Sequence, residues 1–222
     1  MTEIVYGRNA VREAQRGRRR VLRVWEQADV SREELERLCG SPEHQGVAAE
    51  VEPYAYADAG TLLQPEDALV IALDQVQDPQ NLGAICRSAE GAGATGVVLP
   101  ERGAAHVTPA VCRASAGAVE HLPVARVRNL ADYLGEAKQK GAWVYGADAG
   151  AKRAYTDVDW NGRAVVVLGS EGRGLRPRVR EACDDVVKLP LHGSVGSLNV
   201  SAAAAVLLYE AVRSRAAGGR GT

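Results

Sequence analysis

The 222-residue chain contains no phenylalanine and a single methionine, and aromatic residues make up only 5% of it. A hydrophobic core therefore has to be built from aliphatic side chains, chiefly those of valine, leucine and alanine. The four cysteines, at positions 39, 86, 112 and 183, form no CxxC pair and no cluster with histidine. This spacing argues against a metal site and against a disulfide framework, and it predicts free thiols in a reducing compartment.

Long apolar runs and a signal-like opening segment are also missing, so we expect a soluble, cytoplasmic protein without a membrane partner. The formal net charge is −1, which by itself does not indicate nucleic-acid binding. A surface for RNA would have to be local, and Arg16–Arg23, with five arginines, is the best candidate. A solvated arginine-rich turn explains the same residues equally well.

Three familiar motifs do not occur: the phosphate loop G-x-x-x-x-G-K-S/T, the dinucleotide fingerprint G-x-G-x-x-G and the nucleophile elbow G-x-S-x-G. Their absence argues against a dinucleotide-dependent oxidoreductase and against a serine hydrolase. The four histidines lie far apart in the sequence and lack the spacing of a metal-ligand set.

From Ala68 onward, short β-rich runs alternate with helical runs. Strands are expected at Leu69–Asp74, Gly96–Leu99, Ala142–Ala147, Ala164–Gly169 and Asp185–Leu189, with a weaker candidate at His121–Val124. Helices are expected at Asn81–Gly91, Pro109–Gly117, Leu130–Lys140, Arg176–Ala182 and Asn199–Ser214. Because the strands are continuously apolar, they should be buried on both faces. The pattern predicts an α/β fold with a mostly parallel sheet and helices on both faces.

The pattern of residues 1–52 predicts a small α/β unit. It is too short for an independent core and should pack against the rest of the chain. Its expected elements are a helix at Asn9–Gln15, a strand at Val21–Glu26, a capped helix at Ser31–Leu38 and a strand at Gly46–Val51. Residues 53–67 have the composition of a linker. Residues 216–222 are expected to be a frayed tail.

The first of three chemically suggestive stretches surrounds Arg87. An Asp-Pro turn followed by Asn81 opens a helix after a buried strand. Arg87 lies off the packing face of this helix, and Gly83, one turn earlier, has no side chain. The guanidinium is therefore expected to reach back toward Asn81, where it would suit a phosphate or an oxyanion. A surface arginine paired with Glu90 is the alternative.

The second stretch, Gly169–Gly174, places three glycines directly after a buried strand, so the backbone can approach a ligand closely. Glu171 within it suits a hydroxyl, an amine or an arginine better than a phosphate. A structural turn is the alternative interpretation of the glycines.

The third stretch is a polar loop, Pro190–Ser197, between Leu189 and Leu198. The two leucines could sandwich a flat ring while the loop backbone contacts its edge. Ser197 and Asn199 are good N-cap residues, so the last helix should begin close to them. We expect the three stretches to build one cofactor site.

Taken together, these stretches resemble the motifs of the SpoU (TrmH-like) branch of the SPOUT RNA 2′-O-ribose methyltransferases. The matching segments are Asp78-Pro-x-Asn81-Leu-Gly followed by Arg87, Leu168-Gly-Ser-Glu171-Gly-x-Gly-Leu, and Leu189-Pro-Leu-x-Gly-Ser-Val-x-Ser197-Leu-Asn199-Val-Ser-x-Ala. They occur in the family's order. The resemblance implies a SPOUT domain over 68–215 with a C-terminal trefoil knot, S-adenosyl-L-methionine as cofactor, and a homodimer with a site at the subunit interface.

The front of the chain adds to the resemblance. Tyr6-Gly-x-Asn-Ala-Val-x-Glu-Ala and His44-Gln45-Gly46-Val resemble the L30e-like RNA-binding domain of the 23S rRNA guanosine-2′-O methyltransferase group. Residues 1–52 would be a shortened form of that domain, because the stretch between Val24 and His44 is shorter than usual. The RNA-binding residues that this implies are Arg8, Arg18, Arg19, His44 and Gln45.

The resemblance also implies roles in the site. Arg87 would be the catalytic arginine, supported by Asn81, Glu171, Ser197 and Asn199. Cofactor contacts would come from Leu168, Gly169, Glu171, Gly172, Leu189, Leu191, Ser197 and Leu198. Because the pKa of an arginine is too high for a general base, we expect Arg87 to position the ribose hydroxyl and stabilise the developing alkoxide.

The implied reaction is methylation of a ribose 2′-hydroxyl, of a guanosine in 23S rRNA. Two alternatives stay open: a tRNA ribose or another rRNA nucleotide as substrate, and a non-catalytic RNA-binding or ribosome-assembly protein of the same fold.

Overall fold

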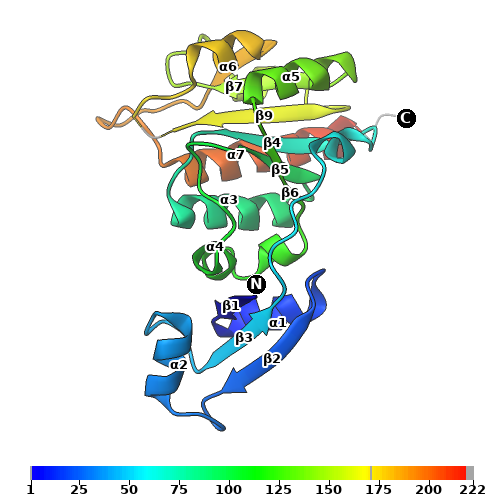
Figure 1. The fold of residues 1–222 in the computed structure, drawn as a ribbon. Coiled ribbons are helices and arrows are strands. Elements are labelled where there is room, and N and C mark those ends of the chain that lie inside the picture. The colour runs from blue at the N-terminus through cyan, green and yellow to red at the C-terminus, as the bar shows by residue number, and fades with distance from the viewer. Residues whose placement is uncertain (1, 171, 219–222) are drawn as a thin grey trace.

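The computed structural model describes residues 2–170 and 172–218. Figure 1 shows a large domain made of a sheet between two layers of helices, with a small unit attached below it. The sheet has seven strands in the described part of the chain, in the order β6-β5-β4-β9-β7-β10-β8, and every neighbouring pair is parallel. The strands are β4 (Leu69–Asp74), β5 (Gly96–Pro100), β6 (Val124–Val127), β7 (Trp143–Ala147), β8 (Arg153–Ala154), β9 (Ala164–Gly169) and β10 (Asp185–Lys188). The predicted α/β class with a parallel sheet is confirmed.

Helices cover both faces of this sheet, as predicted (Figure 1). On one face lie α3 (Pro79–Gly91), α4 (Pro109–Ala114) and α7 (Val200–Gly218), and on the other lie α5 (Leu130–Gln139) and α6 (Pro177–Ala182). Adjacent residues of the central strands alternate between the two cores: Ile71 and Val166 belong to one buried cluster, whereas Val70 and Val165 belong to the other. Each central strand is therefore apolar along its whole length because both of its faces are covered.

The buried core is mostly aliphatic, as the composition predicts, and Trp160 is the main aromatic exception. The Trp160 side chain is fully buried, and its indole Nε1 donates to the carbonyl oxygen of Tyr155 at 3.1 Å. All four cysteines are free thiols. Burial raises the pKa of Cys86 and Cys112 to about 12, so both thiols stay protonated.

Three elements of the large domain differ from their predicted ranges by three or more residues at one end or both. α4 ends at Ala114 rather than Gly117, because Ala116 and Gly117 adopt positive φ angles of 51° and 88°. The short 3-10 helix η2 (Ala118–Glu120) follows, and it delays the start of β6 to Val124. α7 continues to Gly218, so 216–218 are helical rather than frayed, while 219–222 lie outside the described residues.

The small N-terminal unit is an antiparallel sheet, in the order β1-β3-β2, with two helices. Its elements are β1 (Glu3–Tyr6), α1 (Arg8–Arg16), β2 (Val21–Glu26), α2 (Arg32–Cys39) and β3 (Val47–Val51), of which β1 was not predicted. The predicted cap of α2 is confirmed, since Ser31 Oγ accepts from the Glu34 amide at 3.2 Å. Val11 and Val51 share one buried cluster with Val111 and Val119 of the large domain, so the unit has no separate core on this side.

The segment that connects the two units packs against the large domain. It contains the 3-10 helix η1 (Ala59–Leu63), whose Leu62 and Leu63 are buried. Ala57 also forms a parallel bridge with Ala125 of β6. None of the helices in the described residues has the length and apolar character needed to cross a membrane.

Candidate functional site

The candidate site lies where the strand order of the large sheet changes direction. β4 and β9 are neighbours and end together, since Asp74 pairs with Gly169. From β4 the chain continues to β5 and β6 on one side, whereas β7 and β10 lie on the other side of β9. Loops leaving neighbouring strands in opposite directions open a crevice at the carboxyl ends of the strands, which is where α/β proteins bind ligands.

A buried carboxylate joins the first two motif stretches. The Asp74 side chain has no exposure and accepts from the Arg176 amide at 2.8 Å and from Arg176 Nε at 2.7 Å. Charge-assisted hydrogen bonds of this kind offset the cost of burying a carboxylate. The contact holds the glycine-rich loop after β9 against the end of β4. Sequence reasoning missed this role of Asp74, although an acidic residue closing a continuous apolar strand was a usable signal.

Two asparagines join the first and third stretches. Asn199 Nδ2 donates to Asn81 Oδ1 at 2.9 Å, although the residues are 118 positions apart. Asn199 also caps α7, because its Oδ1 accepts from the Ser201 amide at 2.9 Å. The predicted start of the last helix is therefore confirmed. The hydrogen bond sets the beginnings of α3 and α7 side by side, with two of the four predicted supporting residues at the contact.

Arg87 lies on α3, is exposed, and makes no hydrogen bond or ion pair with any described residue, Glu90 included. Its guanidinium is thus available to a ligand. The expected reason for Gly83 is wrong, however. A Cβ at Gly83 would lie 2.4 Å from the Cβ of Ala114, so the missing side chain admits α4 and does not leave room for Arg87.

A cavity of about 370 Å³ lies between the carboxyl ends of β7, β9 and β10 and the start of α7. The predicted cofactor residues that line it are Leu168, Gly169, Gly172, Leu189, Leu191, Ser197 and Leu198. The remaining predicted residue, Glu171, lies outside the described residues. The structure therefore brings residues of the second and third stretches around one cavity.

The cavity fits a flat, partly apolar molecule better than a polyphosphate. A Cβ at Gly169 would lie 2.1 Å from the carbonyl carbon of Gly174, so the loop folds back tightly onto the strand end. The wall is formed largely by leucine and valine side chains and by glycine backbone. Among its lining residues the charged groups are Asp148 and Arg173, and no lysine is there to bind phosphates. These residues suit a flat ring that carries a small polar group.

Asp148 is a lining residue that sequence reasoning missed. It follows the last residue of β7, and its Oδ1 accepts from the Gly150 amide at 2.7 Å while the other oxygen pairs with Arg180. A carboxylate at a strand end was again the available signal. Metal binding has no support in the described ranges, where no cluster of three or more His, Cys, Asp or Glu side chains could hold an ion.

The predicted RNA-binding residues divide into exposed and buried ones. Arg8, Arg18 and Gln45 are exposed, and Arg8 contacts Gln45 through its backbone amide at 3.0 Å. Arg19 and His44, by contrast, are buried, so neither side chain lies on the surface of the small unit. The Arg19 guanidinium binds Glu120 and Glu3, and His44 Nδ1 accepts from the Gly46 amide at 3.0 Å.

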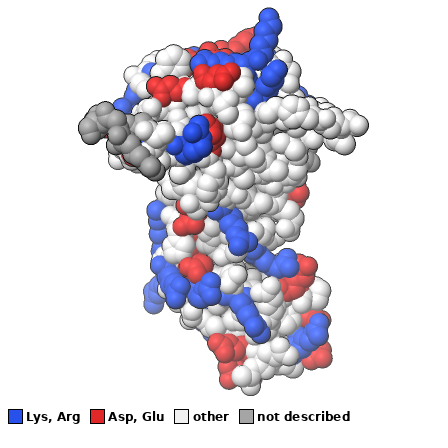
Figure 2. Space-filling model, turned by 180° about the vertical axis from the view of Figure 1, so that it is seen from behind, with Lys and Arg blue, Asp and Glu red and all other residues white. Residues whose placement is uncertain are grey.

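The arginine-rich segment 16–23 is therefore not one continuous basic surface. Arg19 points inward, and the Arg23 guanidinium lies 4.9 Å from the centre of the Trp25 ring. Basic side chains nevertheless gather over the small unit and where it joins the large domain (Figure 2). A hollow of about 440 Å³ on the small unit is lined by Arg8, Gln45 and Arg12 among others.

Comparison with known proteins agrees with this geometry. The model of the SpoU rRNA Methylase family matches residues 68–209, and a model described as RNA 2′-O ribose methyltransferase substrate binding matches residues 28–57. The chain is 39% identical to the putative TrmH family tRNA/rRNA methyltransferase YacO of Bacillus subtilis, with 96% of each covered. It is 46% identical to an uncharacterized tRNA/rRNA methyltransferase of Mycobacterium avium over 84% of this chain and 62% of that protein.

A similar solved structure is that of the SpoU methyltransferase AviRb from Streptomyces viridochromogenes in complex with the cofactor AdoMet. It superimposes with a TM-score of 0.82 at 29% identity, covering 98% of this chain and 92% of that one. Because the match extends over nearly the whole length, the small unit and the large domain share their arrangement with that enzyme.

Proposed function

The chain belongs to the SpoU rRNA methylase family of RNA methyltransferases, and from this premise we propose that it methylates a ribose 2′-hydroxyl of RNA with S-adenosylmethionine as donor. The observation that carries the proposal is the convergence of the three motif stretches. Asn81 and Asn199 meet at 2.9 Å, and Ser197 and Leu198, just before Asn199, line the cavity.

The proposed chemistry divides the work among these residues. S-adenosylmethionine, when bound, supplies an electrophilic methyl group. The ribose hydroxyl is a weak nucleophile that must be aligned with this methyl group and must lose its proton. The Arg87 guanidinium can stabilise the negative charge that develops on the ribose oxygen. Asn81 and Asn199, held by each other, support the ribose, and Ser197 and Glu171 complete the proposed set.

For the substrate we propose a guanosine of 23S rRNA. The N-terminal motifs and the substrate-binding match over 28–57 support an RNA ligand for the small unit. A tRNA substrate is the second candidate, since relatives are named tRNA/rRNA methyltransferases. We further propose that residues 1–52 act as the RNA-binding unit, 53–67 as the connection and 68–215 as the catalytic domain.

Mapping ribose 2′-O-methylation across all rRNA and tRNA in strains with and without the gene tests this proposal. We expect one 23S rRNA guanosine to lose its methyl group in the deletion strain. If only a tRNA nucleotide loses its methyl group, the substrate is tRNA, the second candidate. If no site is lost and calorimetry shows no binding of S-adenosylmethionine at millimolar concentration, the non-catalytic alternative replaces the enzyme.

Gly169→Ala should weaken cofactor binding. The new Cβ would meet backbone atoms of Gly174 at 2.1 Å, and backbone cannot rotate away, so the loop lining the cavity must open. An overpacking cost of about 1–3 kcal/mol corresponds to a Kd raised roughly 5- to 150-fold. Calorimetric titration with S-adenosylmethionine measures this Kd. Gly135→Ala, where nothing lies within 4 Å of the added Cβ, should leave the Kd unchanged. Equal affinities of the two variants would contradict the proposed cofactor site.

The proposed homodimer has a candidate interface on α7. Val206, Tyr209 and Val212 are 40%, 54% and 37% exposed and recur at every third position, which leaves an apolar stripe open on the helix. Sedimentation equilibrium should show twice the chain mass of 23.5 kDa for the native protein. Tyr209→Glu should lower the sedimenting mass toward that of the monomer. Leu22→Glu, at an exposed position of β2, should leave this mass unchanged. A native protein that sediments as a monomer would rule out the dimer.

A further inference from the structure

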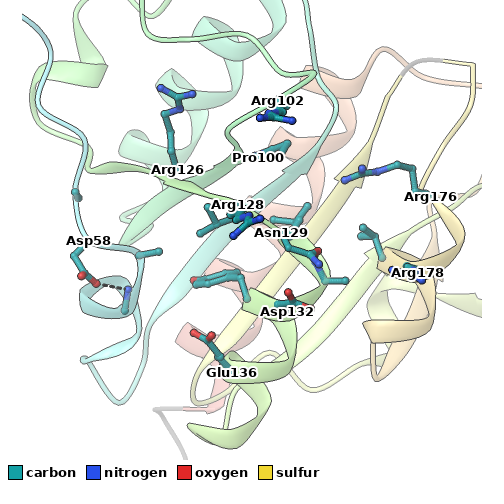
Figure 3. A pocket seen from close by; sticks show the side chains of 18 of the residues that line it. Asp58, Pro100, Arg102, Arg126, Arg128, Asn129, Asp132, Glu136, Arg176 and Arg178 are labelled. Carbon is teal, nitrogen blue, oxygen red and sulfur yellow. Dashed lines mark hydrogen bonds between the residues drawn. The ribbon is translucent and has the colours of Figure 1, made fainter.

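A second hollow, of about 1190 Å³, lies at the same edge of the sheet as the cofactor cavity but over the ends of β5 and β6 (Figure 3). We call it the arginine groove. Five arginines line it: Arg102, Arg126, Arg128, Arg176 and Arg178. They come from the loop after β5, from β6 and the turn after it, and from the start of α6, and they are spread along the groove instead of converging on one point (Figure 3).

The positive charge of three of these side chains is uncompensated. Arg102, Arg128 and Arg178 are exposed and form no hydrogen bond or ion pair with any other residue that the structure describes. By contrast, Arg176 is held by Asp74, and Arg126 donates to the Glu101 carbonyl oxygen at 2.9 Å. The three exposed guanidinium groups are thus available to a ligand with several negative charges.

Acidic residues also line the hollow. Asp58 and Glu136 lie away from Arg102 and Arg176, whereas Asp132, at the start of α5, lies between Arg128 and Arg178 in the view of Figure 3. A polyanion would therefore be attracted most strongly to the part of the groove near Arg102, Arg128 and Arg176.

Buried donors without protein partners point to the same place. Tyr133 lines the groove with only 4% of its surface exposed, and its hydroxyl has no hydrogen-bond partner among the described residues. The Nε atom of Arg126 is buried in the same way. Because buried polar groups nearly always bind a protein group or an ordered water, these two donors leave hydrogen-bonding capacity at the wall of the groove that a water or an acceptor of a ligand can satisfy.

The groove and the cofactor cavity are neighbours along the chain. Arg176 lines the groove, and it directly follows the loop whose residues Gly172–Gly174 line the cavity. Resting on the proposed function, we propose that the arginine groove binds backbone phosphates of the substrate RNA beyond the nucleotide that is methylated. The spread of the guanidinium groups suits successive phosphates of a chain better than one small anion.

The test compares Arg102→Gln/Arg128→Gln with the native protein in methylation of a 23S rRNA transcript and in binding of the same transcript labelled with fluorescein. We expect the KM for RNA to rise roughly 5- to 10-fold, and the slope of log affinity against log salt to become shallower by about 0.7 for each lost phosphate contact. The Kd for S-adenosylmethionine should not change. The variant Arg102→Lys/Arg128→Lys, which keeps the charge, should restore most of the salt slope.

A matched control removes the same charge elsewhere. Lys140→Gln/Lys152→Gln replaces two exposed cations that lie outside the groove, outside the cofactor cavity and outside residues 1–52. If the groove variant behaves like this control while the native protein methylates RNA, the inference fails and the proposed function stands. If the native protein neither binds S-adenosylmethionine nor methylates RNA, the proposed function itself fails. Weakened binding of inorganic pyrophosphate with unchanged RNA binding would also overturn the inference.

Discussion

Arg87→Ala should lower the kcat for RNA methylation roughly 100- to 1,000-fold, the usual loss when one preorganised group that stabilises a developing negative charge is removed. The physical reason is that Arg87 is the cation of the first motif stretch and forms no hydrogen bond or ion pair with the described residues. Arg87→Lys should recover only part of the rate, because an ammonium lacks the planar fork of a guanidinium. Single-turnover methyl transfer from labelled S-adenosylmethionine measures both variants.

The folded state should survive this change. Arg87 is exposed on α3, and surface substitutions usually change the free energy of unfolding by no more than about 0.5 kcal/mol. Lys152→Ala, at an exposed position outside the candidate site and outside residues 1–52, is the control and should keep the native rate. A near-native kcat for Arg87→Ala, with RNA and cofactor still bound, would remove Arg87 from the catalytic step.

Glu120→Ala should destabilise the protein by about 3–5 kcal/mol, the cost of breaking a buried ion pair and leaving one charge without its partner. The Glu120 side chain is fully buried and accepts from Arg19 Nε at 2.9 Å, while Arg19 Nη1 binds Glu3 at 2.8 Å. Burial by itself would lower the pKa of Arg19, but the hydrogen bonds and charge of Glu120 raise it above its ordinary value. Arg19 therefore stays charged, and it ties the small unit to the large domain.

Urea unfolding followed by circular dichroism measures this effect. The double variant Arg19→Met/Glu120→Leu should recover most of the loss, since apolar side chains can replace a buried ion pair. Arg32→Ala breaks the exposed pair with Glu36 and should cost only about 0.3–0.5 kcal/mol. Similar costs for Glu120→Ala and Arg32→Ala would show that the contact between the units does not depend on this ion pair.

The elements of the large domain could be predicted because each carries a local signal. Strands such as Ala164–Gly169 are continuously apolar, and Asn199 caps the helix that follows it. β1, β8 and the true start of β6 could not be predicted. Their pairing depends on partners far along the chain, as when Glu3 pairs with Val51, and no short window contains that information.

Interpretation of single residues was less secure than interpretation of motifs. Arg19 and His44 were expected at the surface because they are polar residue types, but tertiary packing buries both side chains. Gly83 was assigned to the space around Arg87, whereas the structure shows that it admits α4. In each case the sequence reports which side chain is present, and only the neighbouring chain segments decide what that side chain contacts.

By itself, the sequence determined the parallel α/β class and the three motif stretches, because hydrophobic period, caps and glycine positions are local properties of the chain. Only the tertiary structure decided that Asn81 meets Asn199, that Asp74 anchors the loop after β9, and that arginines from β5, β6 and α6 line one groove. These contacts join residues as much as 118 positions apart. Strand order brings them together, and strand order is set by the packing of the whole sheet.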